Sequence, residues 1–250
     1  MTAPTLRASF DGDGGDRIEA ELWLPEGEAR GGVLLVHEAL GIDSFTHRVA
    51  RTLVGAGWAT LVPDLWSRET RAEGSDGEAP WSAERARAAA AALSDRRVAG
   101  DLESAAAYLA ERCDVAGRLG VLGSSTGGTQ AFLFACRSRR VEAAVLLYAP
   151  LVYGELSASK PVQPLEMALN LSAPLLAVFG GRDDWAPPEH ARRLRDTLGS
   201  FAKPFEELTV PGAGHGFLDP RRPVHEEEEA GRVWSRVLQF LDRALAPDAA

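Results

Sequence analysis

Unbroken apolar runs that alternate with helix-forming segments constrain the fold of this chain more than any other feature of its sequence. Apolar runs without interspersed polar residues are typical of strands that are covered on both faces of a sheet. The runs are Glu19–Leu24, Val33–His37, Ala59–Pro63, Leu119–Leu122, Ala143–Tyr148, Leu175–Phe179 and Phe205–Val210. Amphipathic, helix-forming segments lie between them, at Thr46–Gly55, Ala83–Glu111, Gly128–Ser138, Glu189–Leu198 and Glu226–Leu245. This order predicts an α/β fold with a doubly wound, mostly parallel sheet and helices on both faces.

Three segments fall outside that alternation. The stretch FDGDGGDRI, residues 10–18, supplies Gly and Asp for the turn of an antiparallel hairpin at the edge of the sheet. Ser67–Ser82 is rich in charge, Gly and Ser, and we interpret it as a surface loop, with a mobile flap as the alternative. Ser157–Leu171 is expected to make a short excursion over the top of the sheet. No insertion is long enough for a cap domain, so we expect one domain over residues 1–250.

Composition excludes several classes of partner. The net charge of −9 argues against nucleic acid or an anionic membrane. No window approaches the roughly 18 apolar residues of a membrane span, and no signal peptide is recognisable, so we expect a cytoplasmic protein. The two cysteines, Cys113 and Cys136, form neither a CxxC pair nor part of a metal-like cluster. We therefore expect no metal, no disulfide and no cofactor, in a monomer or homodimer.

The stretch GSSTG, residues 123–127, lies between a predicted strand and a predicted helix. It fits GxSxG, the strand-to-helix elbow that lifts a central serine, here Ser125, above the end of a sheet. Glycines at 123 and 127 are expected because the elbow brings the helix and strand backbones into contact. The following helix offers its N-terminal amides to a developing negative charge, with the Thr126 N–H as one oxyanion donor.

A serine nucleophile needs a base that is oriented by a third group. Asp183 follows the strand Leu175–Phe179, and His215 lies in a glycine-rich loop after the strand Phe205–Val210. The order Ser, Asp, His is that expected of an α/β-hydrolase. Asp184 could serve in place of Asp183, which could otherwise cap the next helix. Histidines at 37, 47, 190 and 225 are interpreted as structural or solvent-facing.

The loop after the strand Val33–His37 is the expected source of the second oxyanion donor, and its spacing indicates the N–H of Ala39. Glu38 beside it is unusual, because a carboxylate there repels the developing charge unless it swings away, is protonated or pairs with a cation. The alternative is a plain surface acid that pairs with Arg48 or Arg68.

Several stretches together resemble the dienelactone hydrolase family of α/β-hydrolases. VLLVHEALGI resembles that family's loop with a glutamate beside the oxyanion hole, and LVPDLWSR, GDLESAAAYL, FGGRDDWAPPE and PGAGHGF resemble its later motifs. In the best-known members of the family a cysteine occupies the elbow and the glutamate keeps it unreactive until substrate binds, whereas this chain has Ser125. The family's carboxylate-binding arginines have no clear counterpart: Asp219 lies four residues after His215, and Arg221 two further on.

These observations predict a serine hydrolase that cleaves small esters or lactones through Ser125, His215 and Asp183, with Thr126 and Ala39 as the oxyanion hole. The alternatives are a thioesterase or peptidase with the same triad, or a non-catalytic scaffold that binds a small ligand. Trp66, Trp81 and Trp185 are candidates to line an apolar acyl site, although a tryptophan in a loop more often packs on its neighbours.

Overall fold

The computed structural model describes residues 5–67, 82–113, 115 and 118–245. Its strands form one eight-stranded sheet in the order β1-β2-β4-β3-β5-β6-β7-β8. They are β1 (Thr5–Asp11), β2 (Arg17–Trp23), β3 (Gly31–Val36), β4 (Trp58–Pro63), β5 (Leu119–Ser124), β6 (Ala143–Leu147), β7 (Leu175–Gly180) and β8 (Phe205–Val210). The pairs β1–β2 and β2–β4 are antiparallel and the others are parallel. The predicted mostly parallel sheet and the edge hairpin are confirmed.

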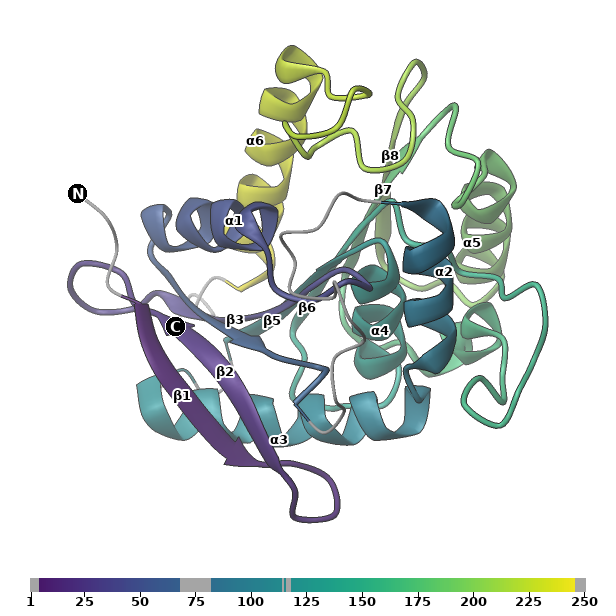
Figure 1. Ribbon diagram of the computed structural model, residues 1–250. Coiled ribbons are helices and arrows are strands. Elements are labelled where there is room, and N and C mark those ends of the chain that lie inside the picture. The colour runs from purple at the N-terminus through teal and green to yellow at the C-terminus, as the bar shows by residue number, and fades with distance from the viewer. Residues whose placement is uncertain (1–4, 68–81, 114, 116–117, 246–250) are drawn as a thin grey trace.

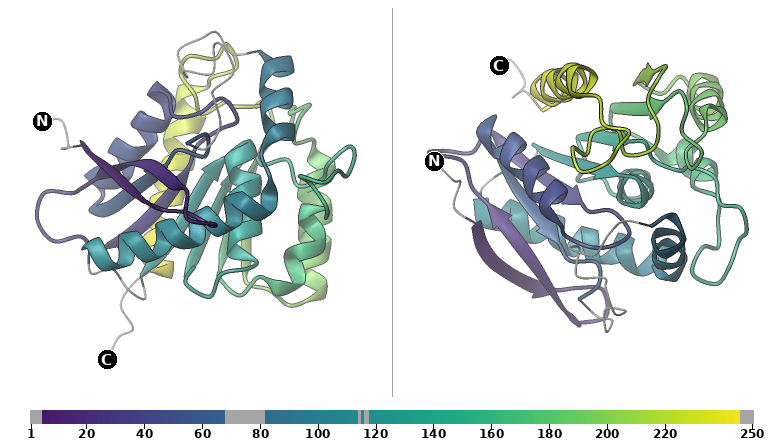
Figure 2. Two further views of the ribbon diagram at one scale, coloured as in Figure 1. Left: turned by 60° about the horizontal axis from the view of Figure 1, so that its bottom comes forward. Right: turned by 45° about the horizontal axis from the view of Figure 1, so that its top comes forward.

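Helices cover both faces of this sheet (Figures 1 and 2). They are α1 (Ser44–Gly55), α2 (Ala83–Ala92), α3 (Asp95–Cys113), α4 (Thr126–Ala135), α5 (Pro188–Ser200) and α6 (Glu227–Ala244), with a 3₁₀ helix at Pro164–Asn170. Because successive strand residues point to opposite faces, Val33 and Leu35 pack with α1 and α6, whereas Leu34 and Val36 pack with α3, α4 and α5. The doubly wound α/β architecture is therefore the one that the apolar runs predict.

The helix-forming segment Ala83–Glu111 is helical as expected, but the chain divides it into two helices, α2 and α3. Leu93 adopts an extended conformation, with φ −63° and ψ 126°, and its side chain enters the core. The break also places Asp95 in a buried position, where its carboxylate contacts Lys160 Nζ at 2.6 Å and Gln130 Nε2 at 2.7 Å. Burial of Leu93 and this polar cluster outweigh the helix propensity of the alanine-rich segment.

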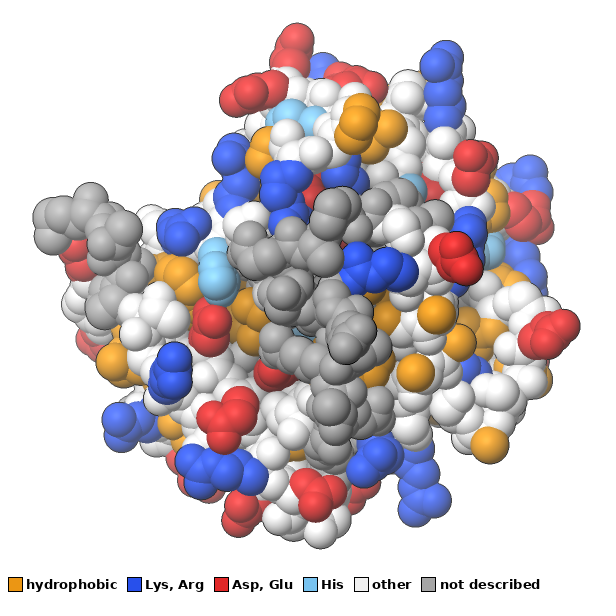
Figure 3. All heavy atoms as spheres, in the orientation of Figure 1, with side chains coloured by type: hydrophobic (Ala, Val, Ile, Leu, Met, Phe, Trp, Pro, Cys, Tyr) orange, Lys and Arg blue, Asp and Glu red, His pale blue; other side chains and the backbone are white. Residues whose placement is uncertain are grey.

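The carboxyl ends of the parallel strands meet at one edge of the sheet, where ligands bind in open α/β sheets. The segments that follow β3, β5, β7 and β8 carry Glu38 and Ala39, Ser125, Asp183, and His215. On the face shown in Figure 3, acidic and basic side chains are interspersed. Ser67–Ser82, interpreted above as a loop, lies largely outside the described residues, and the single domain over residues 1–250 stays a prediction.

Candidate active site

Ser125 lies at a sharp turn between β5 and α4. Its φ of 52° and ψ of −125° fall in a region that a residue with a side chain rarely adopts, and its side chain is buried. The two flanking glycines make this turn sterically accessible. A Cβ at Gly123 would lie 2.2 Å from the carbonyl oxygen of Gly127, and one at Gly127 would lie 2.3 Å from the carbonyl oxygens of Val36 and His37. The turn thus has the geometry of a nucleophile elbow.

The structure brings the predicted serine, histidine and aspartate into one hydrogen-bonded chain. His215 Nε2 lies 2.8 Å from Ser125 Oγ, and His215 Nδ1 lies 2.8 Å from Asp183 Oδ2. The three residues are far apart in the sequence and follow three different strands. A base within hydrogen-bond reach of a hydroxyl, and itself held by a carboxylate, is the arrangement that activates a serine.

The neighbouring carboxylates Asp183 and Asp184 differ sharply in their surroundings. Asp183 is only 2% exposed, and its Oδ1 accepts hydrogen bonds from the backbone N–H groups of Trp185, at 2.7 Å, and Ala186, at 2.8 Å. Asp184 is exposed and lines a pocket. Asp183 is therefore the carboxylate that orients His215 in this structure, as the sequence analysis preferred.

Aromatic rings hold the His215 side chain on two sides. The Trp185 ring lies 5.0 Å from the imidazole, centroid to centroid, with planes 30° apart. The Tyr148 ring lies 5.2 Å away at 72°, an edge-to-face contact. Such contacts restrict the imidazole to the plane in which both nitrogens meet their partners. Tyr148 itself has a φ of 43°, an uncommon value that turns the chain at the end of β6.

Side chains outside the triad fix the loop that carries the predicted second oxyanion donor. The N–H of Leu65 donates to His37 Nε2 at 3.0 Å, so His37 Nδ1 carries the proton and donates to the Glu38 carbonyl oxygen at 2.7 Å. Trp66 Nε1 donates to the Ala39 carbonyl oxygen at 3.0 Å. These bonds orient the peptides on both sides of Ala39, including the one that carries the Ala39 N–H. Thr126, the predicted first donor, is the first residue of α4, where an N–H has no partner within the helix.

Glu38 pairs with a cation that the sequence analysis did not identify. Its carboxylate forms an ion pair with Arg222, a buried residue seven positions after His215, and accepts a hydrogen bond from the Tyr148 hydroxyl at 3.3 Å. Pairing with Arg48 is therefore wrong, and Arg68 lies outside the described residues. Arg221, considered above, instead binds Asp219 and Asp43.

The groups around Glu38 keep one another in the protonation states that the ion pair and the hydrogen bond require. Burial alone would lower the pKa of Arg222, but the charges of Glu38 and Asp219 and the Tyr148 hydroxyl together raise it, so the guanidinium stays charged. Burial raises the pKa of Tyr148 well above its usual value, and the Glu38 carboxylate raises it further. The phenol therefore stays protonated and able to donate. The carboxylate beside the predicted oxyanion hole is neutralised by Arg222 rather than left to repel a second negative charge.

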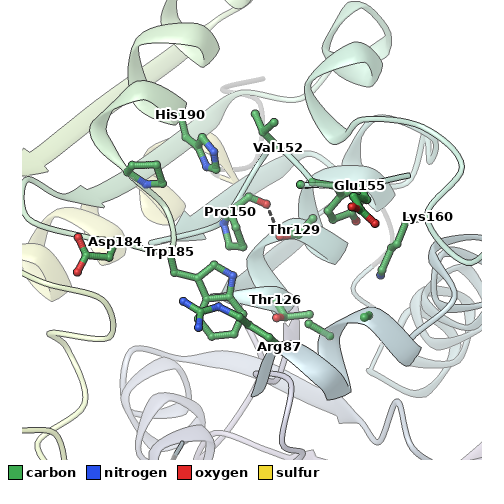
Figure 4. Close-up of a pocket in the computed structure, with 15 residues that line it drawn as sticks. Arg87, Thr126, Thr129, Pro150, Val152, Glu155, Lys160, Asp184, Trp185 and His190 are labelled. Atoms are coloured by element: carbon green, nitrogen blue, oxygen red, sulfur yellow. Dashed lines mark hydrogen bonds between the residues drawn. The ribbon is translucent and has the colours of Figure 1, made fainter. Parts of the chain in front are cut away.

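Two hollows flank the triad. One, of about 530 Å³, is lined by residues of α2, the start of α4 and the segments after β6 and β7, among them Thr126 (Figure 4). The other, of about 320 Å³, is lined by His215, Gly214, Arg222 and Val224. Trp185 and Arg87 line both, and the Arg87 guanidinium lies 5.5 Å from the centroid of the Trp185 ring. Of the three candidate tryptophans, Trp185 lines both hollows, Trp66 donates to the Ala39 carbonyl oxygen, and Trp81 lies outside the described residues.

No helix in the ranges given above is both long enough and apolar enough to cross a membrane. In the same part of the chain, no group of three or more His, Cys, Asp and Glu side chains is arranged to hold a metal ion.

Comparisons with known proteins identify the family of this chain and agree with its fold. The model of the family described as "Dienelactone hydrolase family" matches residues 18–245. A Bradyrhizobium protein named "Probable 2-oxo-3-(5-oxofuran-2-ylidene)propanoate lactonase" is 31% identical over 232 residues, which are 92% of this chain and 91% of that protein. A Salmonella typhimurium protein named "Putative carboxymethylenebutenolidase" is 29% identical over 209 residues, 84% of this chain and 76% of the other. A Klebsiella pneumoniae crystal structure titled as that of a "Putative Dienelactone Hydrolase" superposes with a TM-score of 0.85, at 24% identity, over 96% of this chain and 99% of that one.

Proposed function

Because the chain belongs to the dienelactone hydrolase family, we propose that it hydrolyses small esters or lactones with Ser125 as the nucleophile. The observation that carries this proposal is the chain of two 2.8 Å hydrogen bonds from Ser125 through His215 to Asp183, at an elbow of the required geometry. The names of the relatives support lactones in particular, since both name enzymes that act on butenolide or furanone rings.

In the proposed reaction, Ser125 Oγ attacks the carbonyl carbon while His215 Nε2 takes its proton. The tetrahedral oxyanion is bound by the N–H groups of Thr126 and Ala39, each of which stabilises the transition state by about 3 kcal/mol. His215 then gives the proton to the departing alkoxide as the acyl-enzyme forms. Water, deprotonated by His215, cleaves the acyl-enzyme and restores Ser125. For a lactone, the hydroxyl released in the first half stays attached to the acyl group.

Glu38 takes a different place in this mechanism from that of the family's cysteine enzymes. A serine hydroxyl does not rest as a thiolate, so it needs no carboxylate to hold it unreactive. Here Glu38 forms the ion pair with Arg222 and accepts from Tyr148, which places two charged groups and a phenol at the wall of the site. We propose that this cluster shapes the site beside His215 rather than taking protons during turnover.

A fluorophosphonate probe tests the nucleophile directly. Intact mass after exposure to the probe should show one adduct on the wild type and none on Ser125→Ala, with ester turnover lost in the variant. Circular dichroism of both proteins checks that the fold is retained. Labelling of the Ser125→Ala variant at the wild-type rate, or retained ester turnover, would refute the assignment.

A further inference from the structure

The larger of the two hollows, of about 530 Å³, is lined mainly by apolar atoms. Its lining includes Ala90 and Ala91 of α2, together with Pro150, Val152 and the Trp185 ring, which Figure 4 labels. In Figure 3, hydrophobic side chains come to the surface along α2. A volume of about 530 Å³ falls within the range of roughly 300–1,000 Å³ that is typical of small-molecule sites.

Several polar groups at this pocket are already bound within the protein. Thr129 Oγ1 donates to the Pro150 carbonyl oxygen at 2.7 Å. His190 Nδ1 accepts from the backbone N–H of Leu151 at 3.2 Å. Lys160 Nζ lies 2.6 Å from Asp95 Oδ1, so its charge is compensated. The charged residues Arg87, Glu155 and Asp184 also line the pocket, but all three are exposed to solvent. The buried part of the lining therefore offers mainly apolar surface to a ligand.

The far wall of the pocket is held in place by the cluster around Asp95. The Tyr153 hydroxyl donates to that carboxylate at 3.0 Å, and the N–H of Asp95 donates to the Ser159 carbonyl oxygen at 3.0 Å. Ser159 Oγ in turn donates to the Ala91 carbonyl oxygen at 3.0 Å. The segment after β6 is thereby tied to both α2 and α3. Bonds within the protein therefore hold this wall in place, which lowers the entropy lost on binding.

The position of His215 decides which part of an ester enters this pocket. In the proposed reaction His215 gives its proton to the leaving oxygen, so the alcohol part lies on the His215 side, where the smaller hollow is lined by His215 itself. The larger pocket begins instead at Thr126, whose N–H is a proposed donor to the carbonyl oxygen. We propose, on the basis of the proposed function, that it is an acyl subsite for uncharged acyl chains longer than acetyl.

Two isomeric esters test this assignment. Ethyl hexanoate and hexyl acetate contain the same atoms and differ only in which side of the ester carries the long chain. Burial of each methylene favours the transition state by about fourfold, so kcat/KM for ethyl hexanoate should exceed that for hexyl acetate by at least about tenfold. Initial rates of acid release in a pH-stat, with ethyl acetate as the reference substrate, give these values.

A variant that fills the pocket provides a second test of the acyl subsite. Ala91→Trp should lower the ratio of kcat/KM for ethyl hexanoate to that for ethyl acetate by about tenfold, because the indole occupies the volume that the chain needs. The matched control is Ala92→Trp, which places the same side chain at the next residue of α2, outside the pocket lining, and should leave the ratio unchanged.

The results distinguish failure of the acyl subsite from failure of the proposed function. A preference for hexyl acetate, equal rates for the two isomers, or an unchanged ratio in Ala91→Trp would overturn the acyl subsite while leaving Ser125 as the nucleophile. If the wild type hydrolyses none of the three esters and the fluorophosphonate does not label Ser125, the proposed function itself is wrong and the subsite fails with it.

Discussion

At the scale of single residues, the two adjacent aspartates after β7 offer a direct comparison of roles. Asn at position 183 cannot accept from His215 Nδ1–H and from two backbone N–H groups as the carboxylate does, so the imidazole loses the tautomer that accepts the serine proton. Asp183→Asn should lower kcat for ester hydrolysis by about a thousandfold or more. Asp184→Asn should remain at least about a hundredfold more active than Asp183→Asn. Comparable losses in steady-state assays of both variants would contradict the assignment.

The ion pair between Glu38 and Arg222 makes a second prediction. Both side chains are largely buried, so removing one partner leaves a charge without compensation. Arg222→Met should lower the free energy of unfolding by about 3 kcal/mol, and Glu38→Gln combined with Arg222→Met should be markedly less destabilising than the sum of the two single changes. Urea unfolding of the four proteins gives the coupling energy. Additive effects would show that the pair contributes no net interaction.

These residues also show how far the site was predictable. Ser125, Asp183 and His215 each lie in a short motif directly after a strand, and a local pattern is enough to find them. Arg222 and Tyr148 approach Glu38 across 184 and 110 residues of sequence, and no local pattern reports such contacts. The adjacent arginines illustrate the limit, since only the folded chain turns Arg222 inward and leaves Arg221 exposed.

At the scale of elements, the elbow depends on the close approach of α4 to the end of β3. Gly127→Ala places a Cβ 2.3 Å from two carbonyl oxygens of Val36 and His37, which are backbone atoms that cannot move alone. We expect a loss of more than about 3 kcal/mol in the free energy of unfolding. Gly231→Ala in α6 is the matched control: nothing lies within 4 Å, so it should stabilise the protein by roughly 0.5–1 kcal/mol. Chemical denaturation curves of both variants settle the comparison, and similar effects would count against the elbow geometry.

A pair between α1 and β2 makes stability depend on pH. His47 Nε2 lies 3.0 Å from Glu21 Oε2. The hydrogen bond and charge of Glu21 raise the pKa of His47 above 6.5. Burial alone would raise the pKa of Glu21, but His47 lowers it below 4.5. The stabilisation should therefore be complete between pH 4.5 and 6.5, fade at higher pH as His47 loses its proton, and fade at lower pH as Glu21 gains one.

Unfolding of wild type and His47→Gln across pH measures this contribution. The difference in unfolding free energy should be largest in that window and should shrink on both sides. Glu21→Gln should give the same profile, since it removes the other partner. A difference that stays flat from about pH 4 to about pH 9 would show that the pair does not titrate as described.

At the scale of the whole molecule, the fold was predictable because its strands are covered on both faces and so appear as unbroken apolar runs. The order of strands in the sheet carries no such signature, and the break between α2 and α3 depends on a buried cluster of residues from distant segments. One wall of the larger pocket is α2, which ends at that break, and another is the segment after β6. Its shape is therefore a property of the assembled chain rather than of any one motif.

The sheet order also means that Ser125 and His215 follow strands that differ in their protection from local unfolding. β5, which leads to Ser125, lies between β3 and β6 and is buried throughout, whereas β8, which leads to His215, pairs only with β7 and is partly exposed. Amides of residues 205–210 should exchange with deuterium at least about tenfold faster than those of residues 119–124, measured by mass spectrometry of peptides that cover each strand. Local opening of the edge would then remove the base from a nucleophile that stays in place. Equal protection of the two strands would mean instead that the site is lost only when the whole sheet unfolds.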